Sequence, residues 1–239
     1  ARDSAGNFTA QPRTNANNPL AALDFRNNEY NENRLVGNVF AELSFLPSLR
    51  VRSQLGFDLR NGNTYAFTPE YDISPSFRNV SPSTTQYSDF QSSLIWDNTL
   101  TFDKAFGSHD VEAVGGTTIE TNYYRFINAT TQGQPGNDPS LRYLGAGPEV
   151  VNIGGSLAES NLLSFFGRLN YNFSDRYLLT AVARYDGSSR FWANNRFAFF
   201  PYVSAAWRIS EEPFFPHTEL VTKLQLRAEW VQNGNPRIR

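Results

Sequence analysis

The sequence contains no cysteine and no methionine, and it has only two histidines among 239 residues. The missing cysteine excludes disulfides, thiolate chemistry and cysteine-ligated zinc sites. No apolar run approaches the ~18 residues that a membrane-spanning helix needs. A formal net charge of −2 argues against a nucleic-acid partner. Because the chain also lacks an initiator methionine and a signal-peptide pattern, we expect it to be an internal section of a longer protein.

Alternation of apolar and polar residues begins at Arg34 and recurs along most of the chain. A period of two over ten or more residues predicts β-strands, and pairs of such runs joined by short connections predict antiparallel hairpins. We therefore expect eight strands in four hairpins. The predicted pairs are 34–45 with 49–60, 91–103 with 110–124, 161–173 with 177–186, and 197–209 with 221–231.

Each predicted strand has one row without charges and an opposite row that carries Arg, Asp or Glu. Strands of ten to fifteen residues exceed the ~5–6 of soluble domains and suit a tilted membrane crossing. Aromatic residues, 15% of the chain, gather near strand ends, which is typical of the girdles of outer-membrane barrels. The pattern favours an all-β protein, an antiparallel transmembrane β-barrel in which the uncharged rows face lipid.

The connections alternate between short and long. Outer-membrane barrels keep short turns in the periplasm and long loops outside. We therefore expect residues 34–231 to form the eight transmembrane strands and the short connections to be periplasmic. The predicted extracellular segments are 1–33, the long loops 61–90 and 125–160, the segment 187–196, and 232–239 as the start of the next outer loop.

Two stretches carry a family resemblance. Residues 165–191 read FFGRLNYNFSDRYLLTAVARYDGSSRF, and residues 195–215 read NRFAFFPYVSAAWRISEEPFF. They resemble the barrel of SusC/RagA-type TonB-dependent outer-membrane transporters, and segments 96–116 and 223–235 are similar to family segments in the expected order. The chain departs from the family at Tyr202, where Ser is usual, and at 231–235, where Gly-x-Thr-Gly-Asn is common.

The resemblance implies about eight strands of a larger, 22-stranded type of barrel. Such transporters are not enzymes and need no cofactor. They import oligosaccharides or peptides across the cell outer membrane of Gram-negative, Bacteroidetes-like bacteria. The implied partners are a SusD-like surface lipoprotein, the remaining strands of the same barrel, outer-membrane lipid, and TonB. Contact with TonB would run through a plug domain that is not present in this sequence.

An open section of barrel leaves two edges, and an unpaired backbone group in lipid costs several kcal/mol. We therefore expect the strands near 34–45 and 221–231 to pair with other strands of the same barrel. One alternative is a complete small outer-membrane barrel with a structural or adhesive role, in which the first strand closes on the eighth. Another is a soluble carbohydrate-binding β-sandwich, whose apolar rows would face each other. An outer-membrane hydrolase is opposed by the lack of a histidine-centred catalytic group.

No catalytic, cofactor or metal site is predicted. His109 and His217 have no carboxylate-histidine cluster beside them, and Ser188 and Ser189 are interpreted as part of a tight polar loop after Asp186. Six arginines on the charged rows could line a route for an anionic or hydroxyl-rich substrate: Arg50, Arg52, Arg60, Arg168, Arg184 and Arg208. We favour the alternative that they form ion pairs that hold the wall.

Aromatic residues are also frequent in the two long predicted loops. Exposed aromatic rings could stack on sugars or fill an interface with the lipoprotein, and the sequence does not separate these uses. The residues are Tyr65, Phe67, Tyr71, Phe77, Tyr87, Tyr124, Phe126 and Tyr143.

Overall fold

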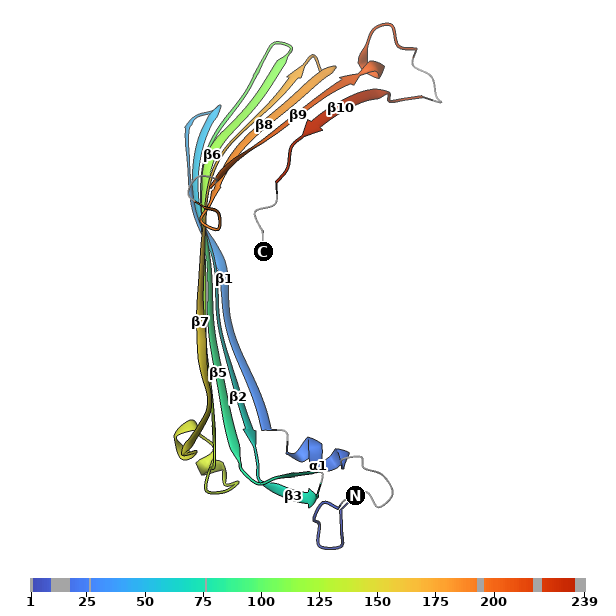
Figure 1. The fold of residues 1–239 in the computed structure, drawn as a ribbon. Coiled ribbons are helices and arrows are strands. Elements are labelled where there is room, and N and C mark those ends of the chain that lie inside the picture. Colours follow the sequence, from blue (N-terminus) through green and yellow to red (C-terminus); the bar gives the residue numbers. More distant parts are fainter. Residues whose placement is uncertain are drawn as a thin grey trace. The chain divides into compact units, whose positions relative to one another are not determined.

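Eight strands of the computed structural model form one antiparallel sheet in the order β1-β2-β5-β6-β7-β8-β9-β10 (Figure 1). The structure describes residues 2–9, 18–25, 27–75, 77–192, 196–216 and 221–234. The strands are β1 (Asn27–Leu46), β2 (Leu49–Thr68), β5 (Ser83–Phe106), β6 (His109–Gln132), β7 (Glu149–Phe173), β8 (Tyr177–Ser188), β9 (Phe197–Arg208) and β10 (Gln225–Val231).

The remaining elements are short. Helix α1 (Pro19–Asp24) starts after Asn18, whose side chain accepts hydrogen bonds from the backbone N–H groups of Leu20 and Ala21. The others are a small hairpin and three 3₁₀ turns: β3 (Tyr71–Ser74), β4 (Phe77–Asn79), η1 (Pro139–Leu141), η2 (Leu144–Ala146) and η4 (Ile209–Glu211). Among the described residues, no helix has the length and apolar character needed to cross a membrane.

The short turns follow from local backbone chemistry. Ser174 and Asp175 both have positive φ, at 54° and 57°, and the N–H of Arg176 donates to the carbonyl of Phe173 at 3.0 Å. Positive φ at both central residues is typical of a type I′ turn, whose twist matches that of the flanking strands, and Arg176 completes a three-residue connection. The turn fixes the register of β7 on β8, from Phe173 opposite Tyr177 to Leu162 opposite Ser188.

The chain divides into two compact units. Unit 1 comprises 1–35, 59–91 and 123–158, and unit 2 comprises 36–58, 92–122 and 159–239. Among the residues of unit 1 that the structure describes, the buried hydrophobic side chains are Ala21 and Phe67. The buried side chains of unit 2, among its described residues, are polar: Ser164, Ser188, Ser204, Ser210 and Glu212.

Large hydrophobic side chains in unit 2 are exposed along the rows that the alternation identified. They include Leu43, Leu55, Trp96, Leu100, Ile119, Phe165, Leu169, Leu179, Val203, Leu226 and Trp230. No second sheet of the described residues covers them, since the only other sheet is the β3–β4 hairpin. The prediction of an open section of an antiparallel barrel is therefore confirmed, and the β-sandwich alternative is wrong. The first and eighth strands lie at opposite ends of the sheet order, which removes the alternative of a small closed barrel.

Several strand ends differ from the prediction. Strand β1 begins at Asn27, inside the segment 1–33 predicted as loop, and β2 and β5 extend into the predicted loop 61–90. Likewise β6 and β7 extend into 125–160, whereas β10 begins only at Gln225. The extensions contain many Asn, Thr, Ser and Gly residues together with exposed apolar side chains such as Val150, Val151 and Ile153 on β7, and they lack a regular period of two. The strands therefore continue beyond the point where the alternation that predicted them stops. The extracellular and periplasmic assignments stay predictions.

Candidate functional site

The charged rows of unit 2 form ion pairs between neighbouring strands. Arg52 on β2 lies 3.8 Å from Glu42 on β1. Arg168 on β7 donates to Glu112 on β6, which also accepts from the amide of Asn170 at 3.3 Å. Each pair joins two adjacent strands on one face of the sheet. Because these pairs are partly exposed, each one stabilises the wall only modestly.

The other predicted arginines of unit 2 behave similarly. The guanidinium of Arg184 binds Asp186 at 2.7 Å, and it donates to Ser164 on β7 at 2.9 Å. Arg208 donates to the carbonyl of Asp175 in the β7–β8 turn at 3.3 Å. Arg50 also lies on β2, two residues before Arg52. In unit 2 the structure therefore brings four of the predicted arginines to carboxylates or a turn of the wall: Arg52, Arg168, Arg184 and Arg208.

Arg60, in unit 1, has a different setting. Its Nε lies 3.1 Å from Glu32 Oε2 on β1, and its Nη2 lies 3.5 Å from Asp89 Oδ2 on β5. The hydroxyl of Tyr30 donates to the same Glu32 carboxylate. Asp89 is only 4% exposed. One cation thus links three strands and compensates a buried carboxylate, which would be costly to bury without a partner.

Gly62 creates the space for this arrangement. A Cβ atom built on Gly62 would lie 2.5 Å from Asp89 Oδ1, closer than side-chain carbons occur. The Asp89 carboxylate therefore lies against the bare backbone of β2. A glycine inside a strand often marks such a close approach, so Gly62 was a signal in the sequence. It was missed because 61–90 was predicted to be loop.

Three aromatic rings lie beside this ionic group. The hydroxyls of Tyr87 on β5 and Tyr124 on β6 are 2.7 Å apart. Phe126 lies 5.6 Å from Tyr87 and 6.1 Å from Tyr124 between ring centroids. Tyr87 and Asp89 are two residues apart on β5, so they share a face of the sheet. We call Tyr30, Glu32, Arg60, Tyr87, Asp89, Tyr124 and Phe126 the ionic–aromatic cluster.

The other loop aromatics serve mainly to pack unit 1. Phe67 is 1% exposed and lies under the Arg142 guanidinium, 4.7 Å from it. Tyr65 donates to the carbonyl of Arg142. Tyr71 stacks on Phe25 with centroids 4.5 Å apart and contacts Phe77 at 5.0 Å. Tyr143, by contrast, is 53% exposed.

Unit 1 also has a groove of about 310 Å³, which is lined by polar side chains such as those of Asn31, Asn63 and Gln86 and by apolar side chains such as those of Ile127 and Leu144. Asn63 donates to Asn61 at 2.8 Å, two residues back on β2. Because Asn61 and Asn63 alternate with Arg60 and Gly62, their side chains lie on the face opposite the ionic–aromatic cluster. The groove therefore lies mainly on the other face of the sheet, and Tyr87 is the member of the cluster that also lines it.

The residues considered for catalysis have structural partners. His109 Nδ1 lies 2.7 Å from the Tyr171 hydroxyl, and its ring packs against Phe106 and Phe173 at 5.6 and 4.8 Å. Ser189 Oγ accepts from the N–H of Asn161 at 2.8 Å. Ser188 Oγ accepts from the N–H of Arg190 at 3.3 Å. His217 lies outside the described residues, and within them no group of three or more potential metal ligands occurs.

The chain matches a family model described as the β-barrel of TonB-dependent receptors over residues 1–238. It belongs to that family, as a section of the barrel. Members of the family are transporters and not enzymes. The SusC/RagA resemblance drawn from segments such as 165–191 is confirmed by relatives that cover most of the chain.

Among these relatives, the TonB-dependent receptor SusC of Bacteroides thetaiotaomicron is 32% identical over 97% of this chain and 22% of its own length. The TonB-dependent receptor P3 of Formosa agariphila is 30% identical over 92% of this chain and 22% of its own length. A solved structure of the RagAB peptide transporter shares the fold, with a TM-score of 0.84 and 24% identity over 92% of this chain and 24% of the other. The chain thus spans about a fifth of the length of the curated relatives it matches.

Proposed function

We propose that this chain forms part of the wall of a TonB-dependent importer of nutrients, oligosaccharides or peptides, in the outer membrane of a Gram-negative, Bacteroidetes-like bacterium. The observation that carries the proposal is the inverted distribution of side chains in unit 2. Most large apolar side chains of this unit are exposed on one face of a single sheet, while arginine–carboxylate pairs lie on the other face together with Val36 and Phe40. Such a sheet suits a boundary between hydrocarbon and water.

The ionic–aromatic cluster is our proposed contact for passing substrate. Tyr87, Tyr124 and Phe126 present half-buried rings, and the adjacent Glu32 and Arg60 present hydrogen-bonding groups. Rings flanked by a few polar groups are a common composition of small-molecule sites. Of the six predicted arginines, Arg60 alone belongs to this cluster. The remaining five are proposed to hold the wall.

The partners follow from the SusC/RagA resemblance and are proposals as well. A SusD-like surface lipoprotein would cover the mouth of the barrel, and TonB would act through a plug domain in another part of the parent protein. The edge strands β1 and β10 would pair with the remaining strands of the same barrel, since open edges in lipid leave backbone groups unsatisfied. Residues 61–90 and 125–160 would then contribute the extracellular surface.

The test is uptake by cells whose gene for the parent transporter is deleted and then restored. Labelled oligosaccharides and peptides are supplied as separate panels, and we expect one panel to lose uptake in the deletion strain and regain it on complementation. Undiminished uptake of every compound would contradict the nutrient-import proposal.

The role of the cluster is tested with the cargo that this screen identifies. We expect Tyr87→Ala and Tyr124→Ala to reduce its uptake about tenfold at equal surface expression. The matched control is Tyr143→Ala, which removes an exposed tyrosine outside the cluster. Equal uptake by all three variants would contradict a substrate contact at the cluster while leaving the importer itself intact.

A further inference from the structure

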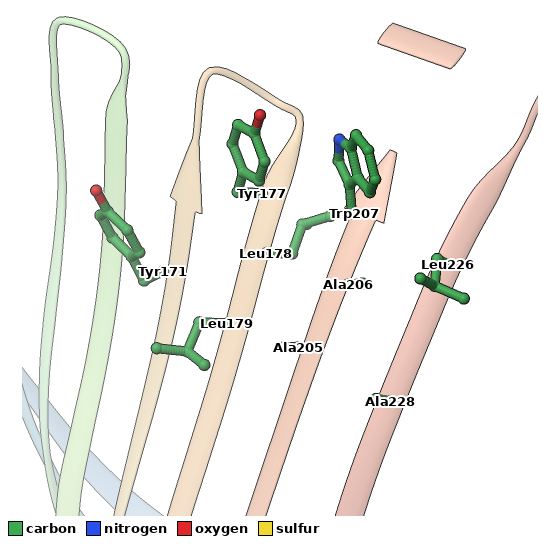
Figure 2. A pocket seen from close by; sticks show the side chains of 9 residues that line it. All are labelled: Tyr171, Tyr177, Leu178, Leu179, Ala205, Ala206, Trp207, Leu226 and Ala228. Carbon is green, nitrogen blue, oxygen red and sulfur yellow. The ribbon is translucent and has the colours of Figure 1, made fainter. Parts of the chain in front are cut away.

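A groove of about 410 Å³ lies on the apolar face of β7–β10, close to the ends of the strands (Figure 2). Its shape follows from the register. Leu179, Ala205 and Ala228 lie opposite one another in neighbouring strands. The next row on the same face, toward the β7–β8 turn, consists of Tyr177, Trp207 and Leu226. Two alanines beside two large rings leave a depression in the surface. Figure 2 shows the rings of Tyr177 and Trp207 standing side by side near the strand ends.

A polar group closes this groove at the end where the rings lie. Glu212, in the connection after β9, accepts from the Tyr177 hydroxyl at 2.6 Å and from the Trp207 indole N–H at 3.0 Å. Its other carboxylate oxygen lies 3.5 Å from Nη1 of Arg176. Both rings are therefore fixed by one buried carboxylate. The apolar groove thus ends at an arginine–glutamate ion pair, whose arginine is half-buried and retains further N–H donors.

We propose that this groove is a binding site for a zwitterionic glycerophospholipid. One acyl chain would lie over Ala205 and Ala228 between Leu179 and Leu226. The phosphate would bind Arg176, and the ammonium of the headgroup would lie toward the acidic side of the ion pair. A headgroup that carries both charges complements an ion pair of zero net charge, whereas a headgroup with net negative charge meets the Glu212 carboxylate without compensation. The proposal rests on the membrane placement given under Proposed function.

The experiment uses the full-length parent transporter in lipid nanodiscs with a trace of photoreactive phospholipid. The probes are phosphatidylethanolamine and phosphatidylglycerol with a diazirine in one acyl chain, and labelled peptides are mapped by mass spectrometry. We expect the ethanolamine probe to label residues 177–207 and 225–231 at least fivefold above 111–123, which is another part of the apolar face. We also expect it to label the groove at least threefold more than the glycerol probe.

Substitutions separate a built site from general lipid contact. Ala205→Phe fills the groove and should lower its labelling to the level of 111–123, while Ala113→Phe adds the same ring to the apolar face of β6 and should leave labelling unchanged. Arg176→Gln should remove the preference for ethanolamine, and Lys104→Gln, near another short turn, should keep it. Heat-dependent gel mobility confirms that each variant is folded, and Ala228→Phe fills the groove from β10 if Ala205→Phe does not fold.

The outcomes are distinct. Uniform labelling along the apolar face of the wild type would overturn the site, as would unchanged labelling in a folded groove-filling variant. Equal labelling by the two probes would overturn the zwitterionic headgroup. Failure of the parent protein to insert into nanodiscs or to fractionate with outer membranes would instead contradict the proposed function.

Discussion

Unit 1 and unit 2 differ in the kind of side chain that forms their interior. Unit 1 buries Phe67 beneath Arg142 and holds its connections through side-chain hydrogen bonds, such as the pair in which Asn137 bonds both backbone groups of Glu70. Unit 2 exposes its large apolar side chains and buries serines and one glutamate. Unit 1 also exposes large apolar side chains, such as Ile127, Val150 and Ile153, so the units differ in whether a large ring is buried and not in whether apolar side chains are exposed.

This contrast lies within one sheet. The same antiparallel ladder contributes residues to both units, so backbone pairing does not distinguish them. The side chains do. Glycines in one unit can be tight or open: a Cβ on Gly62 of unit 1 would collide with Asp89, and one on Gly187 of unit 2 with Phe197, whereas a Cβ on Gly115 of unit 2 would meet nothing within 4 Å. Gly62 and Gly115 therefore offer a tight and an open position for the same substitution.

The largest test of the contrast removes the buried ring of unit 1. Phe67→Ala should lower the local free energy of opening by about 3–5 kcal/mol, because a fully buried phenyl ring leaves a cavity under Arg142. Hydrogen exchange of residues 139–146 measures this loss. Phe45→Ala is the control, since that ring is 61% exposed in unit 2. Equal effects of the two substitutions on residues 139–146 would mean that unit 1 has no core of its own.

The second test places a charge on the two faces of β9. Val203→Arg puts a guanidinium on the apolar face and should destabilise the parent barrel in vesicles by ~2–4 kcal/mol. Tyr202→Arg changes the adjacent residue, whose hydroxyl bonds Glu229 at 3.1 Å, so a new arginine keeps a partner there. We expect it to cost less than about 1 kcal/mol. Chemical denaturation measures the free energy of unfolding of both variants. Equal destabilisation would show that the face of β9 that carries Val203 is not in hydrocarbon.

The sequence predicted unit 2 well because its environment imposes a simple rule. Leu169, Leu179 and Val203 fall on uncharged rows and are exposed on one face, as expected from a period of two. The turn at 174–176 was also predicted, since short polar connections between alternating runs favour hairpins. A rule that repeats every second residue can be read from a single sequence.

Unit 1 was predicted poorly for the converse reason. Asn61, Asn63 and Thr64 are polar on both faces, so nothing in their order distinguishes strand from loop. The partners of Arg60 lie 28 residues before it and 29 residues after it in the chain, at Glu32 and Asp89, and no local pattern relates them. The resemblance to a family placed the wall correctly, but contacts between distant polar residues required coordinates.

The third test concerns the close approach at Gly62. Gly62→Ala would place a methyl group on the Asp89 carboxylate, and such overpacking should destabilise unit 1 by ~1–3 kcal/mol. It should also weaken the Arg60–Asp89 ion pair and lower cargo uptake severalfold. Gly115→Ala introduces the same methyl group where there is open space. A wild-type phenotype for Gly62→Ala would show that Asp89 need not lie against β2.

The smallest expected effect is a pH dependence at the turn end of unit 2. Hydrogen bonds from Tyr177 and Trp207 hold the pKa of Glu212 below its usual 4.5. A lowered pKa in the folded protein means that the carboxylate contributes stability above about pH 4.5, and that this contribution is lost as the pH falls through the folded value. The indole N–H resonance of Trp207, assigned with Trp207→Phe, should therefore shift only in that acidic window. In Glu212→Gln the same resonance should be independent of pH there. A shift that persists in Glu212→Gln would assign the titration to another group and leave Tyr177 and Trp207 fixed by packing alone.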